Sequence, residues 1–209
     1  MDTTWSLVHA ERAALAEDLA GLTDEQWATT SLCSELSVRE VLAHLTAGAV
    51  LSFPRWFLGV VRVRFDFDRQ LVDRLREQLG DSPAETLARF RAAVNRSTTP
   101  LGFRGSSVGA LAEQVVHAED IRRPLGIRRD VPQEVLMLVA EHYASTDLVV
   151  LAKGRIGGLR LVATDSGFTT GAGEEVRGPT LALVMAMTGR GAFCDELTGD
   201  GVEDLRGRC

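Results

Sequence analysis

The chain has 209 residues, of which 45% are hydrophobic and 25% are charged, the balance of a globular protein long enough for one large or two small cores. Its net charge of -6 disfavours a nucleic-acid partner, because affinity for phosphate backbones comes from clustered Lys and Arg. Its uncharged apolar stretches are far shorter than the roughly 20 residues that cross a bilayer, and its first residues do not resemble a signal peptide. We therefore expect a soluble, cytoplasmic protein with no membrane partner.

Apolar residues recur at spacings of three, four and seven over residues 4–22, which predicts an amphipathic helix. Residues 23–26 and 37–40 are capping-box patterns. The first is expected to begin a short helix that carries Trp27, and the second a long helix. Pro54 is expected to end this long helix, because proline forces the preceding residue away from helical geometry.

A helix with a charged outer face is predicted over residues 66–79. Residues 82–85 combine an N-cap serine, a proline and a capping-box glutamate, which predicts that another helix begins there. A loop over 97–105 separates it from a further helix that stops near 124–126. The sequence therefore predicts an all-helical N-terminal bundle over residues 1–128.

The composition then changes. One more helix is expected over 132–145, followed by a half-buried strand over 157–165, where apolar and polar residues alternate. A returning hairpin strand, a third strand, an apolar helix and a short terminal helix follow, at 168–170, 174–177, 179–187 and 201–208. We therefore predict a small α+β domain over residues 129–209, so that the fold class is α plus α+β.

Three residues could bind a divalent metal. Glu113 and His117 are four residues apart on a predicted helix, which places them on one face about 6 Å apart. His44 is flanked by apolar residues and should point toward the bundle interior, where a buried imidazole needs a partner. Two histidines and one carboxylate leave a coordination position open, as in catalytic zinc centres. The alternative is that Glu113 and His117 form a helix-stabilising pair.

Other polar groups near this helix have two interpretations each. Asp120 lies three residues beyond His117 and is either a hydrogen-bond acceptor for an imidazole or a structural cap. The basic cluster at the end of this predicted helix is either a solvated helix end or an anion-binding rim. Its members are Arg122, Arg123, Arg128 and Arg129.

The three cysteines, Cys33, Cys194 and Cys209, are odd in number and irregularly spaced, which argues against disulfides and against a cysteine zinc cluster. Cys33 lies in a predicted turn with no histidine next to it in sequence, and Cys209 is the last residue. We expect all three to be inert thiols. Any thiol chemistry would then require an added cofactor.

Several motifs in both domains occur together and in a characteristic order. In the N-terminal part they are Glu11-Arg12, Cys33 four residues before the Ser37 cap, residues 41–45 with His44, and Glu113-x-x-x-His117-x-x-Asp120 followed by 121–126. In the C-terminal half they are residues 159–165, 173–179, 188–190 and 197–201. On these motifs the chain resembles the mycothiol-dependent maleylpyruvate isomerase family over nearly its whole length. A departure is Leu36, where relatives commonly carry tryptophan.

The resemblance implies a DinB-like four-helix bundle followed by a sterol-carrier-like α+β domain. It implies a metal, zinc above all, bound by His44, Glu113 and His117, with mycothiol as thiol cofactor, in a cytoplasmic enzyme of actinobacterial type. It also implies a catalytic arginine from the second domain, which falls on Arg190, with Arg177 as the other candidate. Either arginine could instead be a salt-bridged surface residue.

A free thiol has a pKa near 8.5 and only its thiolate is nucleophilic. In an isomerase of this family the thiolate would add to a conjugated double bond, allow rotation and leave, whereas in an S-transferase it would attack a small electrophile and stay attached. A hypothesis of another class is a non-catalytic binding or regulatory module, in which a metal is structural or absent and the second domain binds an apolar ligand. The electrophile and the choice between monomer and homodimer are not predicted.

Overall fold

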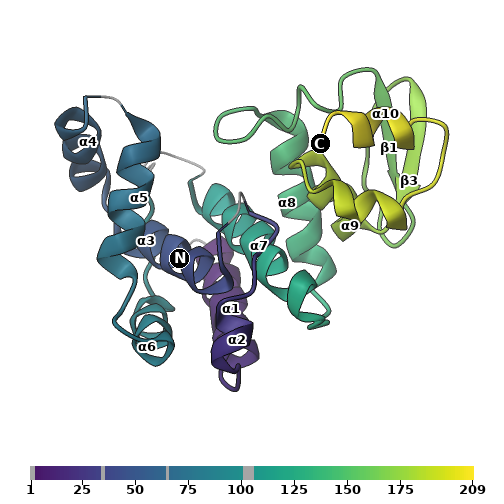
Figure 1. Cartoon of the computed structure of the whole chain (residues 1–209). Coiled ribbons are helices and arrows are strands. Elements are labelled where there is room, and N and C mark those ends of the chain that lie inside the picture. The colour runs from purple at the N-terminus through teal and green to yellow at the C-terminus, as the bar shows by residue number, and fades with distance from the viewer. Residues whose placement is uncertain (1–2, 34–35, 65, 101–105) are drawn as a thin grey trace. The chain divides into compact units, whose positions relative to one another are not determined.

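The computed structural model describes residues 3–33, 36–64, 66–100 and 106–209 (Figure 1). The chain divides into two compact units, Met1–Arg129 and Asp130–Cys209. The first unit is helical, and the second combines helices with a three-stranded sheet. The predicted fold class, a helical bundle followed by a small α+β domain, is therefore confirmed. Part of the loop predicted at 97–105 lies outside the described residues.

Four helices of the N-terminal unit pack on one another as a bundle. They are α1 (Thr3–Asp18), α3 (Val38–Val50), α6 (Pro83–Ala93) and α7 (Ser106–Leu125). The short α2 (Asp24–Trp27) closes one end and contributes a buried indole. The core between these helices includes the buried side chains Leu15, Leu19, Trp27, Val41, Leu42, Leu45, Leu87, Phe90, Ala118 and Ile121. Leu36, the departure from the family pattern, is partly buried against this core.

The helix starts follow the predicted capping chemistry. Thr23 with Gln26 and Ser37 with Glu40 form complete capping boxes at the starts of α2 and α3. Ser82 caps α6 by accepting a hydrogen bond from the amide of Glu85. A side-chain oxygen at each of these positions satisfies a helical N–H that has no partner within the helix. These local contacts explain why the starts could be predicted closely.

The prediction that Pro54 ends the long helix is wrong in detail. Helix α3 already ends at Val50, and Pro54 lies in the first turn of a separate helix, α4 (Phe53–Arg62). Proline is favoured there because the first helical amides have no intrahelical acceptor. Helix α5 (Phe67–Gln78), capped by Asp66, corresponds to the predicted charged helix. It packs against both α3 and α4.

Helix α4 leaves much of its apolar face exposed, with Phe53, Phe57, Leu58 and Val61 each about half exposed or more. Within the described residues no single helix is long and apolar enough to cross a membrane. Helices α3 and α4 reach that length and composition only as a pair, which is bent by 118° at its break.

The basic cluster at the end of α7 is not exposed as a whole. Neither the solvated helix end nor the anion-binding rim describes Arg122. Arg122 is fully buried, and its guanidinium donates to Asp18 at 2.9 Å and to Glu119 at 3.0 Å. Arg129 also donates to Asp18. The cluster therefore binds carboxylates of its own bundle and joins α7 to α1. Only Arg123 and Arg128 are exposed, as a solvated helix end requires.

This buried network makes stability depend on pH. Burial raises the pKa of Glu119 above its ordinary value of 4.5, although Arg122 partly offsets the effect. A carboxyl that binds its proton more tightly when folded favours folding at low pH, and this contribution is lost as the pH rises through the folded-state pKa. We expect the Glu119→Gln variant, which has no proton to lose, to gain stability over the wild type as the pH rises from about 4.5 to 7. Thermal midpoints of both proteins across that range test this; a constant difference would contradict it.

The C-terminal unit contains α8 (Gln133–Ser145) and a sheet in which β1 lies between β2 and β3. The strands span Leu159–Ala163, Thr169–Gly171 and Glu174–Gly178. Strand β1 buries Leu159, Leu161 and Ala163, as the predicted alternation requires. The remaining elements are α9 (Thr180–Met187), the 3-10 helix η1 (Gly191–Glu196), which the sequence did not predict, and α10 (Val202–Gly207). Helix α9 is almost wholly buried and packs on α8, β1 and β3.

Two glycines allow this sheet order. Strand β2 runs antiparallel to β1, whereas β3 pairs in parallel on the other side of β1. The chain therefore passes around the start of β1 within two residues, with Gly171 and Gly173 at φ of 74° and 129°. A β-carbon at either position would overlap a backbone carbonyl oxygen, that of Leu159 or Gly158. Only glycine fits both the positive φ and this close approach.

Candidate metal centre

The three predicted ligands come together in the N-terminal unit. His44 on α3 and Glu113 and His117 on α7 each offer one donor atom, and these atoms all lie within 4.8 Å of one another. Glu113 Oε2 is 3.3 Å from His117 Nε2 and 3.9 Å from His44 Nε2. A tetrahedral zinc with ligands at about 2.1 Å sets them roughly 3.4 Å apart. The donor set therefore fits a divalent cation in chemistry and in spacing. Within the described residues this group contains no fourth donor.

The surroundings of His117 favour positive charge. Burial opposes protonation of His117, but contacts with Asp120, Cys33 and Glu113 outweigh it and raise the pKa well above its ordinary value. Burial likewise opposes ionisation of Glu113, but its contacts with His117 and His44 lower the pKa of its carboxyl. The Glu113 side chain remains 36% exposed and that of His44 25% exposed. The donors are thus partly open to solvent, which leaves room for an exchangeable ligand.

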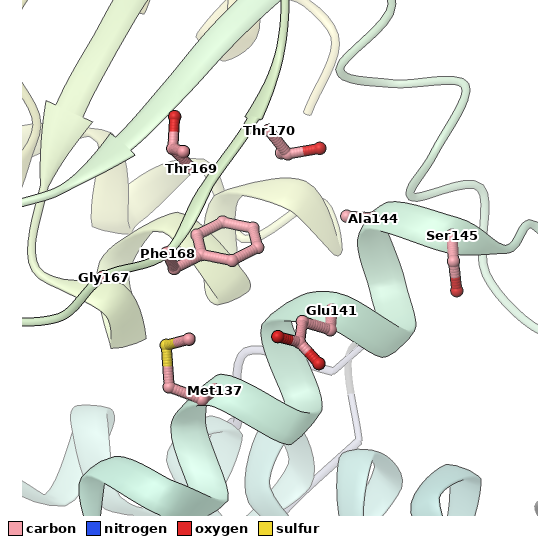
Figure 2. Close-up of a pocket in the computed structure, with 8 residues that line it drawn as sticks. All are labelled: Met137, Glu141, Ala144, Ser145, Gly167, Phe168, Thr169 and Thr170. Atoms are coloured by element: carbon pink, nitrogen blue, oxygen red, sulfur yellow. The ribbon is translucent and has the colours of Figure 1, made fainter.

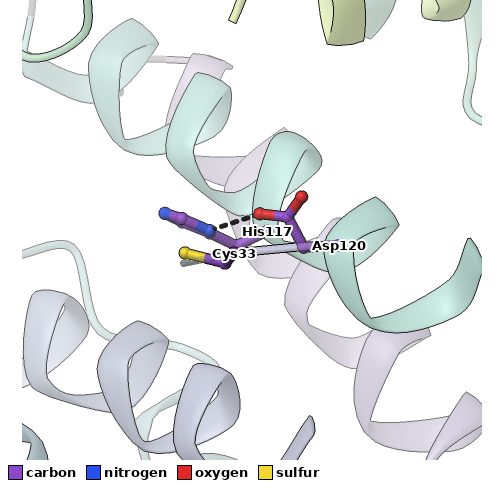
Figure 3. A group of neighbouring side chains, drawn as sticks. All are labelled: Cys33, His117 and Asp120. Atoms are coloured by element: carbon purple, nitrogen blue, oxygen red, sulfur yellow. Dashed lines mark hydrogen bonds and ion pairs between the residues drawn. The ribbon is translucent and has the colours of Figure 1, made fainter. Parts of the chain in front are cut away.

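Asp120 holds the far side of the His117 ring. Its carboxylate is fully buried and lies 2.9 Å from His117 Nδ1 (Figure 3). If Nδ1 donates its proton to Asp120, Nε2 keeps a lone pair and faces Glu113. A carboxylate behind a metal-binding imidazole fixes the tautomer and the ring orientation. Of the two interpretations of Asp120, the geometry favours the hydrogen-bond acceptor over the structural cap.

We expect Asp120→Asn to weaken metal binding by about 10- to 100-fold, because the amide keeps the size of the carboxylate but not its charge. Metal dissociation constants, measured by competition with a chelating dye, test this. Asp130→Asn, at an exposed position, is the matched control and should bind metal as the wild type does. Equal affinity in all three proteins would show that Asp120 does not tune the site.

Cys33 belongs to a second group, with His117 and Asp120, which shares only His117 with the three predicted ligands. No histidine adjoins Cys33 in sequence. The turn that carries it is bound to α7 by a hydrogen bond from the Leu32 amide to the Asp120 carbonyl oxygen, 3.1 Å long. The Cys33 thiol thereby reaches His117 and Asp120 (Figure 3). Sequence spacing could not indicate this contact, because it joins segments more than 80 residues apart.

Burial raises the pKa of Cys194 to about 11, as expected of an inert thiol.

The two candidate arginines both lie in the C-terminal unit. Arg190 precedes η1 and is partly buried, and its Nη1 donates to the Thr188 carbonyl oxygen at 2.7 Å. Arg177 projects from β3 with 45% of its side chain exposed and pairs with Glu175 at 2.8 Å. Arg177 therefore has the environment of a salt-bridged surface arginine.

The C-terminal unit also contains an open cavity of about 280 Å³ between α8 and the start of β2. Figure 2 shows Met137 and Glu141 of α8 on one side and Phe168 on the other. The rest of the lining mixes polar and small residues, namely Ala144, Ser145, Gly167, Thr169 and Thr170. This mixed lining does not favour the predicted apolar ligand of the non-catalytic module.

A known family of protein domains matches most of the N-terminal unit. Residues 8–102 match the model of the family described as "Mycothiol maleylpyruvate isomerase N-terminal domain". The N-terminal unit belongs to this family. The resemblance stated from the sequence motifs is thus confirmed. The match includes His44 and Cys33 and ends before Glu113 and His117, so these two ligands rest on the geometry described above. No curated protein matches the sequence significantly.

Solved structures extend the likeness to nearly the whole chain. A mycothiol-dependent maleylpyruvate isomerase and a histidine-to-alanine mutant of that name align with TM-scores of 0.63 and 0.66 at 15% identity. Each alignment covers 95% of this chain and 92% of the other. At this identity the comparison shows a shared fold over nearly the whole chain. Their fold does not decide its reaction.

Proposed function

We propose that this chain is a metal- and mycothiol-dependent enzyme acting on a small electrophile, either as a cis-trans isomerase of the maleylpyruvate type or as a thiol S-transferase. The observation that carries the proposal is the convergence of His44, Glu113 and His117 donors with no fourth donor from the described residues. The family of the N-terminal unit and the shared fold support it. A cytoplasmic location belongs to the same proposal, because the three cysteines are free thiols.

The residues of the chain have distinct roles in this proposal. His44, Glu113 and His117 would hold the metal, with zinc as the expected ion, and Asp120 orients His117 from behind. A divalent metal supplies a Lewis acid that lowers the pKa of a bound thiol toward neutrality. We assign Arg190 to the substrate, as the family resemblance implies, since an arginine can bind a carboxylate through paired hydrogen bonds.

The test combines metal analysis with a thiol assay. The full chain, purified without chelator, is expected to contain a divalent ion, and with mycothiol and a panel of electrophiles it should turn over at least one of them. Isomerisation of maleylpyruvate with no net loss of thiol identifies the isomerase, whereas stoichiometric thiol loss identifies the transferase. A chain that binds no divalent ion, or that leaves every electrophile unchanged, would favour the non-catalytic module.

A further inference from the structure

A cavity of about 180 Å³ lies beside His44 in the N-terminal unit. It is formed where α3 meets α4 and α5, and its lining is His44, Ala47, Gly48, Leu51, Trp56, Gln70, Arg74 and Pro100. The lining is mostly apolar with a few polar groups, as is usual for small-molecule sites. Its volume is well above the roughly 10–15 Å³ that a single water molecule needs. The cavity therefore suits a small organic molecule, next to one of the candidate metal ligands.

Arg74 gives this cavity a positive charge. It is the one described lining residue with a permanent charge, and no carboxylate is among that lining. Its Nη1 pairs with Glu77 at 2.7 Å, but Glu77 is shared with Arg55 at 3.4 Å. Two guanidinium groups thus face one carboxylate, and the local charge remains positive. An anionic ligand would be favoured over a neutral one of the same shape.

Two polar side chains of the cavity are incompletely satisfied. Gln70 is 4% exposed, and its Nε2 donates to the Trp56 carbonyl oxygen at 2.9 Å. Its Oε1 and the Nε of Arg74 are buried without a hydrogen-bond partner in the described part of the chain. Buried polar atoms without partners are rare in native proteins and often mark the place of an absent ligand or water. Gly59 on α4 makes room for both side chains, because a β-carbon there would crowd them.

We propose that this cavity binds a small organic acid, with Arg74 pairing with its carboxylate and Leu51 and Trp56 contacting its carbon skeleton. A planar guanidinium can bind a carboxylate through two hydrogen bonds and with its full charge. This inference rests on the proposed function in one respect: because His44 belongs to both sites, the acid bound here is the electrophilic substrate. Arg74 is then a specificity-determining residue within the helical unit itself.

The test compares an acid with its uncharged analogue. Butyrate and butyramide share their shape and differ in charge, and their binding to the full chain is measured by calorimetry and by fluorescence of Trp56, with Trp56→Phe identifying its signal. Butyrate should bind at least about ten-fold more tightly than butyramide. Arg74→Met should abolish this preference, and Arg74→Lys should retain part of it. Arg76→Met, at an exposed position of α5 outside the cavity lining, is the matched control and should bind as the wild type does.

Two further variants distinguish binding in this cavity from binding that depends on the proposed metal. Gly48 lines the cavity and a β-carbon there meets nothing within 4 Å, so Gly48→Leu should fill the cavity, favour the helix and abolish binding of both compounds. His117→Ala removes a proposed metal ligand outside the cavity lining and should keep the Arg74-dependent preference, whether or not the metal proposal is correct. Equal affinity for acid and amide in the wild type, or wild-type butyrate binding by Arg74→Met or Gly48→Leu, would overturn the inference.

Discussion

Alanine in place of His117 or His44 is expected to lower metal affinity on the order of 100-fold or more, leaving little metal in the purified chain. The reason is that each histidine supplies one of three converging donors, and loss of even an outer hydrogen-bond partner of a metal ligand typically costs 10- to 100-fold. Elemental analysis after purification without chelator measures the effect. His142→Ala, in the C-terminal unit, is the matched control and should keep its metal.

The two variants differ in their structural risk. His117→Ala leaves the buried Asp120 without its imidazole partner, so it should also lower the thermal midpoint. His44 is a quarter exposed, and its removal should cost less stability. Metal loss from a fully folded His44→Ala protein therefore separates coordination from folding. Wild-type metal content in both variants would refute the site.

Arg122→Leu is expected to destabilise the N-terminal unit by about 3–5 kcal/mol, the range observed when one partner of a buried ion pair is removed. Arg122 is fully buried, and its removal leaves Asp18 and Glu119 without their shared cation. All three tryptophans lie within residues 1–129, so denaturant titrations followed by tryptophan fluorescence report the unfolding of this unit.

Two comparisons control this experiment. Arg128→Gln changes an exposed arginine of the same cluster and should alter stability by no more than about 0.5 kcal/mol. Adding Glu119→Gln to Arg122→Leu removes the carboxylate that loses Arg122, whereas Asp18 keeps its pair with Arg129, and should recover part of the loss. An Arg122→Leu protein within about 1 kcal/mol of the wild type would mean that the network contributes little to the free energy of unfolding.

The metal centre was predictable in part because two of its three donors lie on one helix. Glu113 and His117 are brought together by the repeat of one helix, and the apolar neighbours of His44 indicated that its side chain would face inward. The three donors meet only because α3 and α7 pack against each other, and this packing is set by the tertiary structure. The Cys33 contact with His117 and the role of Arg74 had no local signal. Both depend on which segments lie against one another.

Sequence alone determined the helix starts at Thr23, Ser37 and Ser82, the alternation of β1, and the order of a helical part before an α+β part. The reason is that capping bonds and hydrophobic periodicity act between residues at most a few positions apart. Tertiary structure alone decided that Arg122 is buried, that Pro54 begins α4 and that a charged cavity adjoins His44. These features depend on the burial of one segment by distant ones, and burial sets the energetic consequence of each charge.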